Sequence, residues 1–221
     1  MKRIYFDIDG VLANYVDALL HKLYADTGIS VPYSAIAQYN TKRAVHLFLQ
    51  DDDLATAKLE AVNASLLSGL LGFDGFYLSL QPYQEVLSAV YRLREKYAKN
   101  SDPISFLTAR GTGRHFAMRR RSRSHDVQIQ TKDWLLKWRL TEHDHACPLA
   151  FCSDKAEHLL RLGGSLLLVE DNYDTALAAA RAGIYVLLIE RPWNIMGGTP
   201  MLMHVKEHEV YDHCVAFMEG E

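Results

Sequence analysis

The sequence of 221 residues has little cysteine, no long apolar run and no large excess of either charge. Its three cysteines, Cys147, Cys152 and Cys214, are too sparse for a disulfide framework, which favours a reducing compartment, the cytoplasm. No apolar run approaches the roughly 18 residues expected of a membrane span. Lys and Arg number 24 against 27 Asp and Glu, and this net charge of −3 argues against a generally basic nucleic-acid-binding protein.

What is present is the composition of a globular protein. Apolar residues make up 49% and charged residues 23% of the chain, which excludes disorder of the whole chain. The length suffices for one domain of ordinary size with a smaller insert. Asp7 and Asp9 interrupt the apolar stretch that a signal peptide would need, so we expect no such leader.

Short apolar runs alternate with helix-like segments along most of the chain. Strands are expected at residues 2–7, 104–107, 149–152, 166–169 and 185–189, and helices between them at 86–97, 131–139, 155–162 and 174–182. Nearly continuous apolar strands separated by helices are typical of a parallel sheet covered on both faces. The sequence therefore predicts a doubly wound, Rossmann-like α/β fold with a mostly parallel sheet of about five strands.

Residues 14–82 have a different pattern, with helix-like pieces and no convincing strand. Apolar side chains recur at helical spacing from Val16 to Leu23, and Thr27-Gly28 is a plausible helix end. Asp53 is a candidate N-cap for a second helix over 54–67. We therefore expect a core made of residues 1–13 and 83–221, with a small helical cap, residues 14–82, inserted after the first strand.

Polar residues follow each of the first four predicted strands. In open α/β sheets, ligands bind beyond the carboxyl ends of the strands, so these residues are expected to gather at one edge. The set comprises Asp7 and Asp9 after the first strand, Thr108, Ala109 and Arg110 after the second, Lys155 after the third, and Glu170 and Asp171 after the fourth.

The chemistry of this set indicates phosphoryl transfer. Crowded carboxylates repel one another unless a cation or a proton intervenes. Ligands that offer only oxygen favour Mg²⁺, which is readily shared with a substrate phosphate. Lys155 offers a point charge to phosphate oxygens and Thr108 offers a neutral donor. Together they describe a metal-assisted phosphoryl-transfer site.

Four motifs resemble those of the haloacid dehalogenase superfamily, in the superfamily's order and over residues 4–190. Asp7–Ala13 (DIDGVLA) resembles the first motif and Phe106–Arg110 (FLTAR) the second. Lys155 matches the third motif, and Val169–Asn172 (VEDN) resembles the acidic fourth, with Glu170 where many members have Asp. Within the superfamily, the chain is most similar to the 5′(3′)-deoxyribonucleotidase group. The cues are residues 9–14 (DGVLAN), 73–82 (FDGFYLSLQP) and 191–194 (RPWN).

The resemblance implies a role for each acid. Asp7 is expected to be the nucleophile that forms an aspartyl-phosphate, and Asp9 the general acid and base. Mg²⁺ is expected between the Asp7 carboxylate, the Asp9 main-chain carbonyl and Asp171. Glu170 is expected to orient a metal-bound water.

The resemblance also implies how the substrate is bound. Thr108 and Lys155 are expected to hold the phosphoryl oxygens, with help from the backbone at Ala109. Arg110 is a candidate for contact with the nucleotide. Phe76 and Tyr77 are candidates for stacking on a nucleobase; the alternative is that these rings, with Phe73, Tyr15 and Tyr39, pack the cap against the core.

The expected function is that of a Mg²⁺-dependent phosphomonoester hydrolase acting on a (deoxy)nucleoside monophosphate. A sugar-phosphate or broad-specificity phosphatase, and a catalytically silent module that binds Mg²⁺ and phosphate, are the alternatives. A small phosphate ester is thus the expected partner, with a homodimer as a possible assembly and no membrane.

Two clusters are open to a second interpretation. The basic run of Arg114, Arg119, Arg120, Arg121 and Arg123 could bind nucleic acid or steer an anionic substrate, but a solvated helix face or a mobile loop is the favoured interpretation. His143, His145, Cys147 and Cys152 contain metal-binding residue types, but their spacing is not that of a zinc site.

For the helix near 174, Asp174 is expected to be the N-cap in preference to Glu170 or Asp171.

Overall fold

Six parallel strands form the sheet, in the order β3-β2-β1-β4-β5-β6. A computed structural model describes residues 2–50, 58–97, 103–112, 121–141, 149–194 and 197–220. The central strand β1 pairs with β2 on one side and β4 on the other, so the direction of winding reverses there. The strands are β1 (Lys2–Asp7), β2 (Ile104–Thr108), β3 (Leu149–Phe151), β4 (Ser165–Glu170), β5 (Tyr185–Ile189) and β6 (Leu202–Val205). The doubly wound parallel sheet predicted from the sequence is confirmed.

Alternate side chains of the central strands pack into two apolar cores, one on each face of the sheet. Ile4 and Phe6 of β1 belong to the core that contains α6 (Gln84–Tyr97) and α11 (Val210–Glu219). Tyr5, between them, belongs to the core that contains α9 (Lys155–Leu162) and α10 (Tyr173–Arg181). Because strand side chains alternate in direction, continuous apolar runs are required when both faces are covered.

The structure differs from the sequence-based expectation at three elements. β6 was not expected, because a four-residue edge strand carries too short a pattern to identify. The helix expected at 131–139 is α8 (Arg121–Lys137) and begins earlier. The prediction that Asp174 caps α10 is wrong: Asn172 is the N-cap, and its Oδ1 accepts a hydrogen bond from the Thr175 N–H at 2.9 Å.

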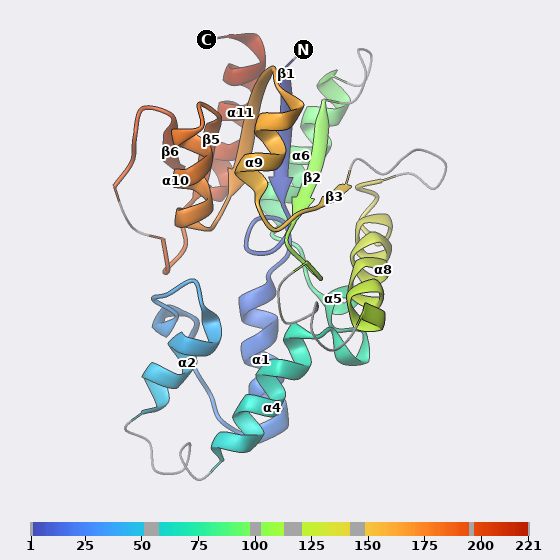
Figure 1. The fold of residues 1–221 in the computed structure, drawn as a ribbon, viewed down its shortest axis with the longest axis vertical. Coiled ribbons are helices and arrows are strands. Elements are labelled where there is room, and N and C mark those ends of the chain that lie inside the picture. The colour runs from blue at the N-terminus through green and yellow to red at the C-terminus, as the bar shows by residue number, and fades with distance from the viewer. Residues whose placement is uncertain are drawn as a thin grey trace.

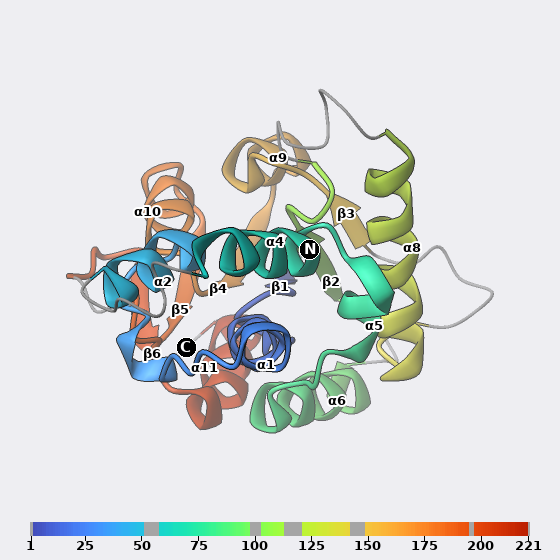
Figure 2. The same cartoon turned by 90° about the horizontal axis from the view of Figure 1, so that it is seen from below.

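A layer of helices lies beyond the carboxyl ends of the strands, below the sheet in Figure 1 and seen face-on in Figure 2. The side chain of Asn14 caps its first helix, and Gly28, with φ of 73°, ends it. Asp53, the expected cap of a later helix, lies outside the described residues. The elements are α1 (Tyr15–Thr27), η1 (Tyr33–Ala35), α2 (Thr41–Leu49), α4 (Leu59–Leu70), η2 (Phe73–Gly75) and α5 (Phe76–Ser79), while η4 (Glu207–Glu209) precedes α11.

The chain enters and leaves this layer through two adjacent segments. The Asn14 N–H donates to the Gln81 carbonyl, and the Tyr83 N–H donates to the Leu12 carbonyl, both at 2.9 Å. The chain thus enters and leaves the helical layer side by side, next to the end of β1. No helix in the described part of the chain is both long and apolar enough to cross a bilayer.

Two adjacent leucines of α9 test the packing of the second core. Leu159 is fully buried, whereas Leu160 is 55% exposed. We expect Leu159→Ala to lower the free energy of unfolding by about 2–5 kcal/mol, through lost burial and a residual cavity. Leu160→Ala, the same change at the surface, should cost about 0.5 kcal/mol or less. Urea denaturation measures both, and equal losses would contradict this placement of α9.

Candidate active site

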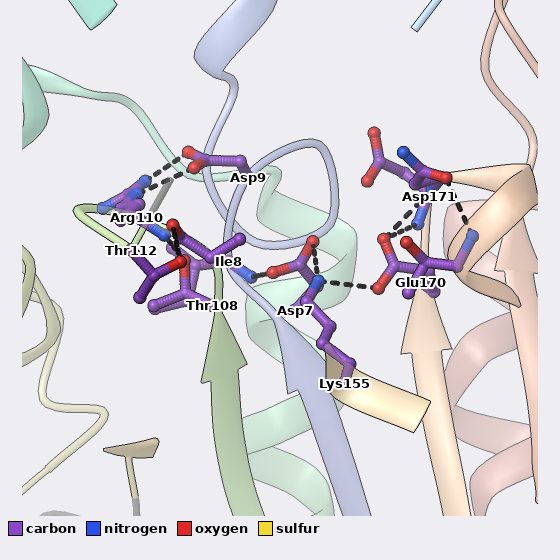
Figure 3. A network of polar contacts seen from close by, with 12 residues as sticks. Asp7, Ile8, Asp9, Thr108, Arg110, Thr112, Lys155, Glu170 and Asp171 are labelled. Carbon is purple, nitrogen blue, oxygen red and sulfur yellow. Dashed lines mark hydrogen bonds and ion pairs between the residues drawn. The ribbon is translucent and has the colours of Figure 1, made fainter. Parts of the chain in front are cut away.

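Three acidic residues and one lysine meet where β1 and β4 end (Figure 3). Asp7 is the last residue of β1 and is buried, and its Oδ1 accepts a hydrogen bond from the Ile8 N–H at 2.7 Å. The Lys155 ammonium lies 2.6 Å from Asp7 Oδ2 and 2.7 Å from Glu170 Oε2. The structure therefore brings the ends of β1 and β4 together with the first residue of α9.

The carboxylates of Asp7, Glu170 and Asp171 lie close enough to share a cation. Each offers an oxygen, and these atoms are within 4.8 Å of one another. Burial raises the pKa of Asp7 and of Asp171 well above the ordinary value, and the Glu170 charge raises both further. Asp171 Oδ1 is buried and has no hydrogen-bond partner among the described residues. A cluster of hard oxygen ligands with one unpartnered oxygen fits a divalent cation such as Mg²⁺.

Lys155 is the counterion that this cluster already contains. Burial alone lowers the pKa of its ammonium, but the charges of Asp7 and Glu170 raise it, and the net effect is a pKa above the ordinary value. The two carboxylates therefore favour the charged form of Lys155. One ammonium against three carboxylates leaves the cluster negatively charged when all three acids are ionised.

Gly10 permits the close approach of Asp171 to the segment that follows β1. A Cβ at Gly10 would lie 1.9 Å from Asp171 Oδ2, well inside van der Waals contact. Its φ of 74° also lies in the left-handed region, which other residues adopt at a cost. A glycine at position 10 is thus required both by the turn and by the packing of Asp171 against it.

Glu170 is fully engaged by the protein. Its Oε2 accepts from Lys155, and its Oε1 accepts from the backbone N–H groups of Asp171 and Asn172 at 3.2 and 3.1 Å. These contacts fix the Lys155 ammonium and the start of the loop after β4. The orientation of a metal-bound water by Glu170 stays a prediction.

Asp9 forms an ion pair with Arg110. Arg110 Nε donates to Asp9 Oδ2 at 2.9 Å and Nη2 donates to Oδ1 at 2.5 Å, a bidentate arrangement. The guanidinium is buried and lies 4.6 Å from the centre of the Tyr77 ring. Sequence reasoning placed Arg110 on the nucleotide and missed this pairing, because residues 101 positions apart carry no local signal of contact.

The other expected substrate contacts lie around this pair. Thr108 is buried and its Oγ1 accepts from the Arg110 N–H at 3.2 Å, while Ala109 is exposed at the turn after β2. Phe76 and Tyr77 are buried, and both rings contact Tyr15, with centroids 5.8 and 6.1 Å away. Their contact with a nucleobase stays a prediction.

The structure does not describe most of the remaining candidates. His143, His145 and Cys147 lie outside the described residues, as do Arg114, Arg119 and Arg120, while the side chains of Arg121 and Arg123 are not described. Burial raises the pKa of the Cys152 thiol to about 11, so this thiol is protonated at neutral pH.

Comparisons with known proteins bear on the fold. No protein-family model and no curated protein sequence matches the chain. A haloacid dehalogenase-like hydrolase from Streptococcus pneumoniae is similar over 96% of this chain and 97% of its own, with 15% identity and a TM-score of 0.55. A HAD family hydrolase from Deinococcus radiodurans, solved with bound phosphate and sodium, is similar over 97% and 94%, with 15% identity and a TM-score of 0.54. A HAD-superfamily hydrolase from Geobacter sulfurreducens is similar over 96% of both chains, with 14% identity and a TM-score of 0.52. At these identities the similarity shows that the chain has the fold of these hydrolases.

The raised pKa of Asp171 predicts how pH affects stability. Between the ordinary pKa and the raised one, the folded state binds more protons than the unfolded state, so the free energy of unfolding falls as pH rises. Asp171→Asn removes this acid while keeping its shape. We expect the metal-free variant to melt about 2–4 °C above wild type at pH 8, which is roughly 1 kcal/mol for a chain of this size, and to gain less at pH 5.

The control is Asp174→Asn, because Asp174 is exposed in the first turn of α10. Its ionised carboxylate is favourable at a helix N-terminus, so its loss should not raise the melting temperature. Calorimetry of both variants in chelator-treated buffer measures the difference. A gain for Asp171→Asn that does not grow with pH would contradict a raised pKa at this position.

Proposed function

We propose that this protein is a Mg²⁺-dependent phosphomonoester hydrolase that acts through a phosphorylated Asp7. The observation that carries the proposal is the buried cluster at the ends of β1 and β4, where Asp7 contacts Lys155 at 2.6 Å and lies with Asp171 inside a 4.8 Å group of oxygens. The shared fold with haloacid dehalogenase-like hydrolases, one of them solved with bound phosphate, supports the reaction class. The cytoplasmic location and the homodimer stay predictions from the sequence.

The metal ion would be held by the Asp7 carboxylate, the Asp171 carboxylate and the main-chain carbonyl of Asp9. When bound, it supplies positive charge that offsets the repulsion between the carboxylates and the substrate phosphate. Asp171 Oδ1, which lacks a partner among the described residues, is the oxygen best prepared to bind it.

The chain's own residues account for the bond changes. An Asp7 oxygen attacks the phosphorus while the bond to the leaving ester oxygen breaks, and Asp9 donates its proton to that oxygen. Asp9, now ionised, accepts a proton from a water that attacks the phosphorus. As that water attacks, the bond between phosphorus and the Asp7 oxygen breaks, phosphate is released and the Asp7 carboxylate is restored. Lys155 and Thr108 bind the phosphoryl oxygens and neutralise charge through both steps.

Arg110 gives Asp9 a fixed position before substrate arrives. Its two donors fill both oxygens of the Asp9 carboxylate. Protonation of Asp9 weakens this ion pair, because the carboxyl group then carries no charge and its O–H faces the leaving oxygen. Arg110 therefore orients Asp9, and the part of the guanidinium that is released can contact the substrate. We infer that Arg110 acts on the reaction chiefly through Asp9.

Substrate selection is assigned to the helical layer, residues 14–82, as a cap over a core of residues 1–13 and 83–221. The hydrogen bonds that join residues 12–14 to 81–83 attach the layer to the core beside Asp9. Gln130 and Trp134 of α8 attach it a second time, through hydrogen bonds to the backbone of Gly72, Tyr77 and Leu80. A nucleoside monophosphate is the proposed substrate, because the rings of Tyr15, Phe76 and Tyr77 lie together in this layer. A sugar phosphate is the second candidate, because Phe76 and Tyr77 pack against Tyr15 and leave fewer ring faces for a base.

A substrate panel tests the proposal. We expect phosphate release from nucleoside 5′- and 3′-monophosphates, slower release from sugar phosphates, and loss of all turnover when Mg²⁺ is chelated. Asp7→Asn should lower turnover by at least about 10³-fold, since it removes the nucleophile. The same panel with that variant corrects for contaminating phosphatases. Turnover that survives Asp7→Asn would remove Asp7 from the mechanism, and no release from any ester would leave a binding module.

The leaving group tests the role of Arg110. p-Nitrophenol leaves readily without a proton, whereas an alkyl alcohol needs one. We expect Arg110→Gln to lower kcat/KM for an alkyl phosphate by roughly 10²-fold and for p-nitrophenyl phosphate by roughly tenfold or less, following the usual size of general-acid catalysis. Asp9→Asn should give the same selective pattern.

The matched control for that experiment is Arg92→Gln. Arg92 lies on α6, exposed and stacked 3.5 Å from the centre of the Tyr211 ring, so its loss should leave both substrates unaffected. Equal losses for the two esters in Arg110→Gln would show that Arg110 binds phosphate and does not act through Asp9.

A further inference from the structure

A buried turn follows β5 and is fastened to the candidate metal site. The Asn194 N–H donates to the Arg191 carbonyl at 3.1 Å, and the Arg191 N–H donates to Asn194 Oδ1 at 2.9 Å. The side-chain nitrogen of Asn194, Nδ2, donates to the main-chain carbonyls of Ile189 and Asp171, both at 2.7 Å. One fully buried side chain thus holds the turn, the end of β5 and the residue after β4 in a fixed relation.

The other two polar side chains of this turn reach the elements that carry the acids. Trp193 Nε1 donates to Asp171 Oδ2 at 3.1 Å, and Arg191 Nε donates to the Gly10 carbonyl at 2.8 Å. Both side chains are buried and each contacts an aromatic ring. The Trp193 and Tyr33 rings meet edge-on, with centroids 5.7 Å apart, and the Arg191 guanidinium carbon lies 3.9 Å from the centre of the Tyr83 ring. The turn therefore contacts both the loop after β1 and the loop after β4.

These contacts make the two oxygens of Asp171 unequal. Oδ2 is bonded to the indole of Trp193, whereas Oδ1 is buried and has no partner in the described part of the chain. A carboxylate that is bonded at one oxygen cannot rotate freely, so the direction of the second oxygen is fixed as well. Hydrogen bonds of this kind to ligating carboxylates commonly set metal affinity.

We propose that Trp193 is a positioning residue for the metal site, whose indole N–H holds Asp171 so that Oδ1 faces the cation. The inference rests on the proposed function in one respect, namely that Asp171 binds a divalent ion. Arg191 and Asn194 serve Trp193 by fixing the turn that carries it. This gives a role to the RPWN segment, which the phosphoryl-transfer chemistry itself does not use.

The test removes the indole N–H and keeps a ring in place. Trp193→Phe is expected to raise the Kd for Mg²⁺, measured by titration calorimetry in the absence of substrate, by about 10–100-fold. Turnover of the variant should return toward the wild-type value as Mg²⁺ is raised to saturation. Trp138→Phe is the matched control, because Trp138 Nε1 has no hydrogen-bond partner among the described residues. Its Kd for Mg²⁺ should equal that of wild type.

The outcomes separate the two proposals. Wild-type protein that binds no Mg²⁺ overturns both the metal site and the role of Trp193. The positioning role alone is overturned if wild type binds Mg²⁺ and hydrolyses esters and Trp193→Phe binds Mg²⁺ with the same Kd.

If Trp193→Phe does not fold, NMR of a protein that keeps Trp193 still tests the inference. The chain has three tryptophans, so ¹⁵N-labelled protein gives three indole resonances, which Trp134→Phe and Trp138→Phe assign by elimination. Addition of Mg²⁺ should shift the Trp193 indole and leave that of Trp138 in place. An unmoved Trp193 indole in protein that binds Mg²⁺ overturns the inference.

Discussion

The buried ammonium of Lys155 is the interaction on which the rest of the site depends. It touches Asp7 and Glu170 at 2.6 and 2.7 Å, and all three side chains are almost completely removed from water. Buried charges are costly unless they are paired, and removing one partner leaves the others uncompensated. Asp7, Glu170 and Asp171 can lie together at this edge of the sheet because Lys155, the first residue of α9, places its ammonium between Asp7 and Glu170.

That requirement explains several features of the fold at once. α9 must begin directly after the short strand β3 so that Lys155 reaches across to β1 and β4, and Asp154 caps the helix at that point. Gly10 must lack a side chain because Asp171 fills the space where a Cβ would stand. The second oxygen of Glu170 accepts from backbone N–H groups, which offsets the cost of removing that oxygen from water.

The sequence predicted the elements whose pattern is local and missed the contacts that depend on packing. β1, α9 and β5 begin and end at the predicted residues, because apolar runs and helix caps depend on residues that are neighbours in the sequence. The convergence of Asp7, Lys155 and Glu170 also followed, since parallel strands bring their carboxyl ends to one edge. The pairing of Asp9 with Arg110 did not follow. It depends on side-chain direction, and the charge pattern fits a substrate contact equally well.

The Asp171 carboxylate illustrates how the two kinds of information combine. Its place after β4 is local, and the sequence shows it. Its Oδ2 accepts a hydrogen bond from Trp193, which lies 22 residues further along the chain, beyond α10 and β5. Only when both are known does the asymmetry of its two oxygens become visible, one held by an indole and one buried without a partner in the described chain. A buried oxygen without a partner at a negatively charged cluster lowers the stability of the fold, and a proton or a cation that binds there offsets that loss. The arrangement is therefore better understood as preparation for a ligand than as a device for holding the fold together.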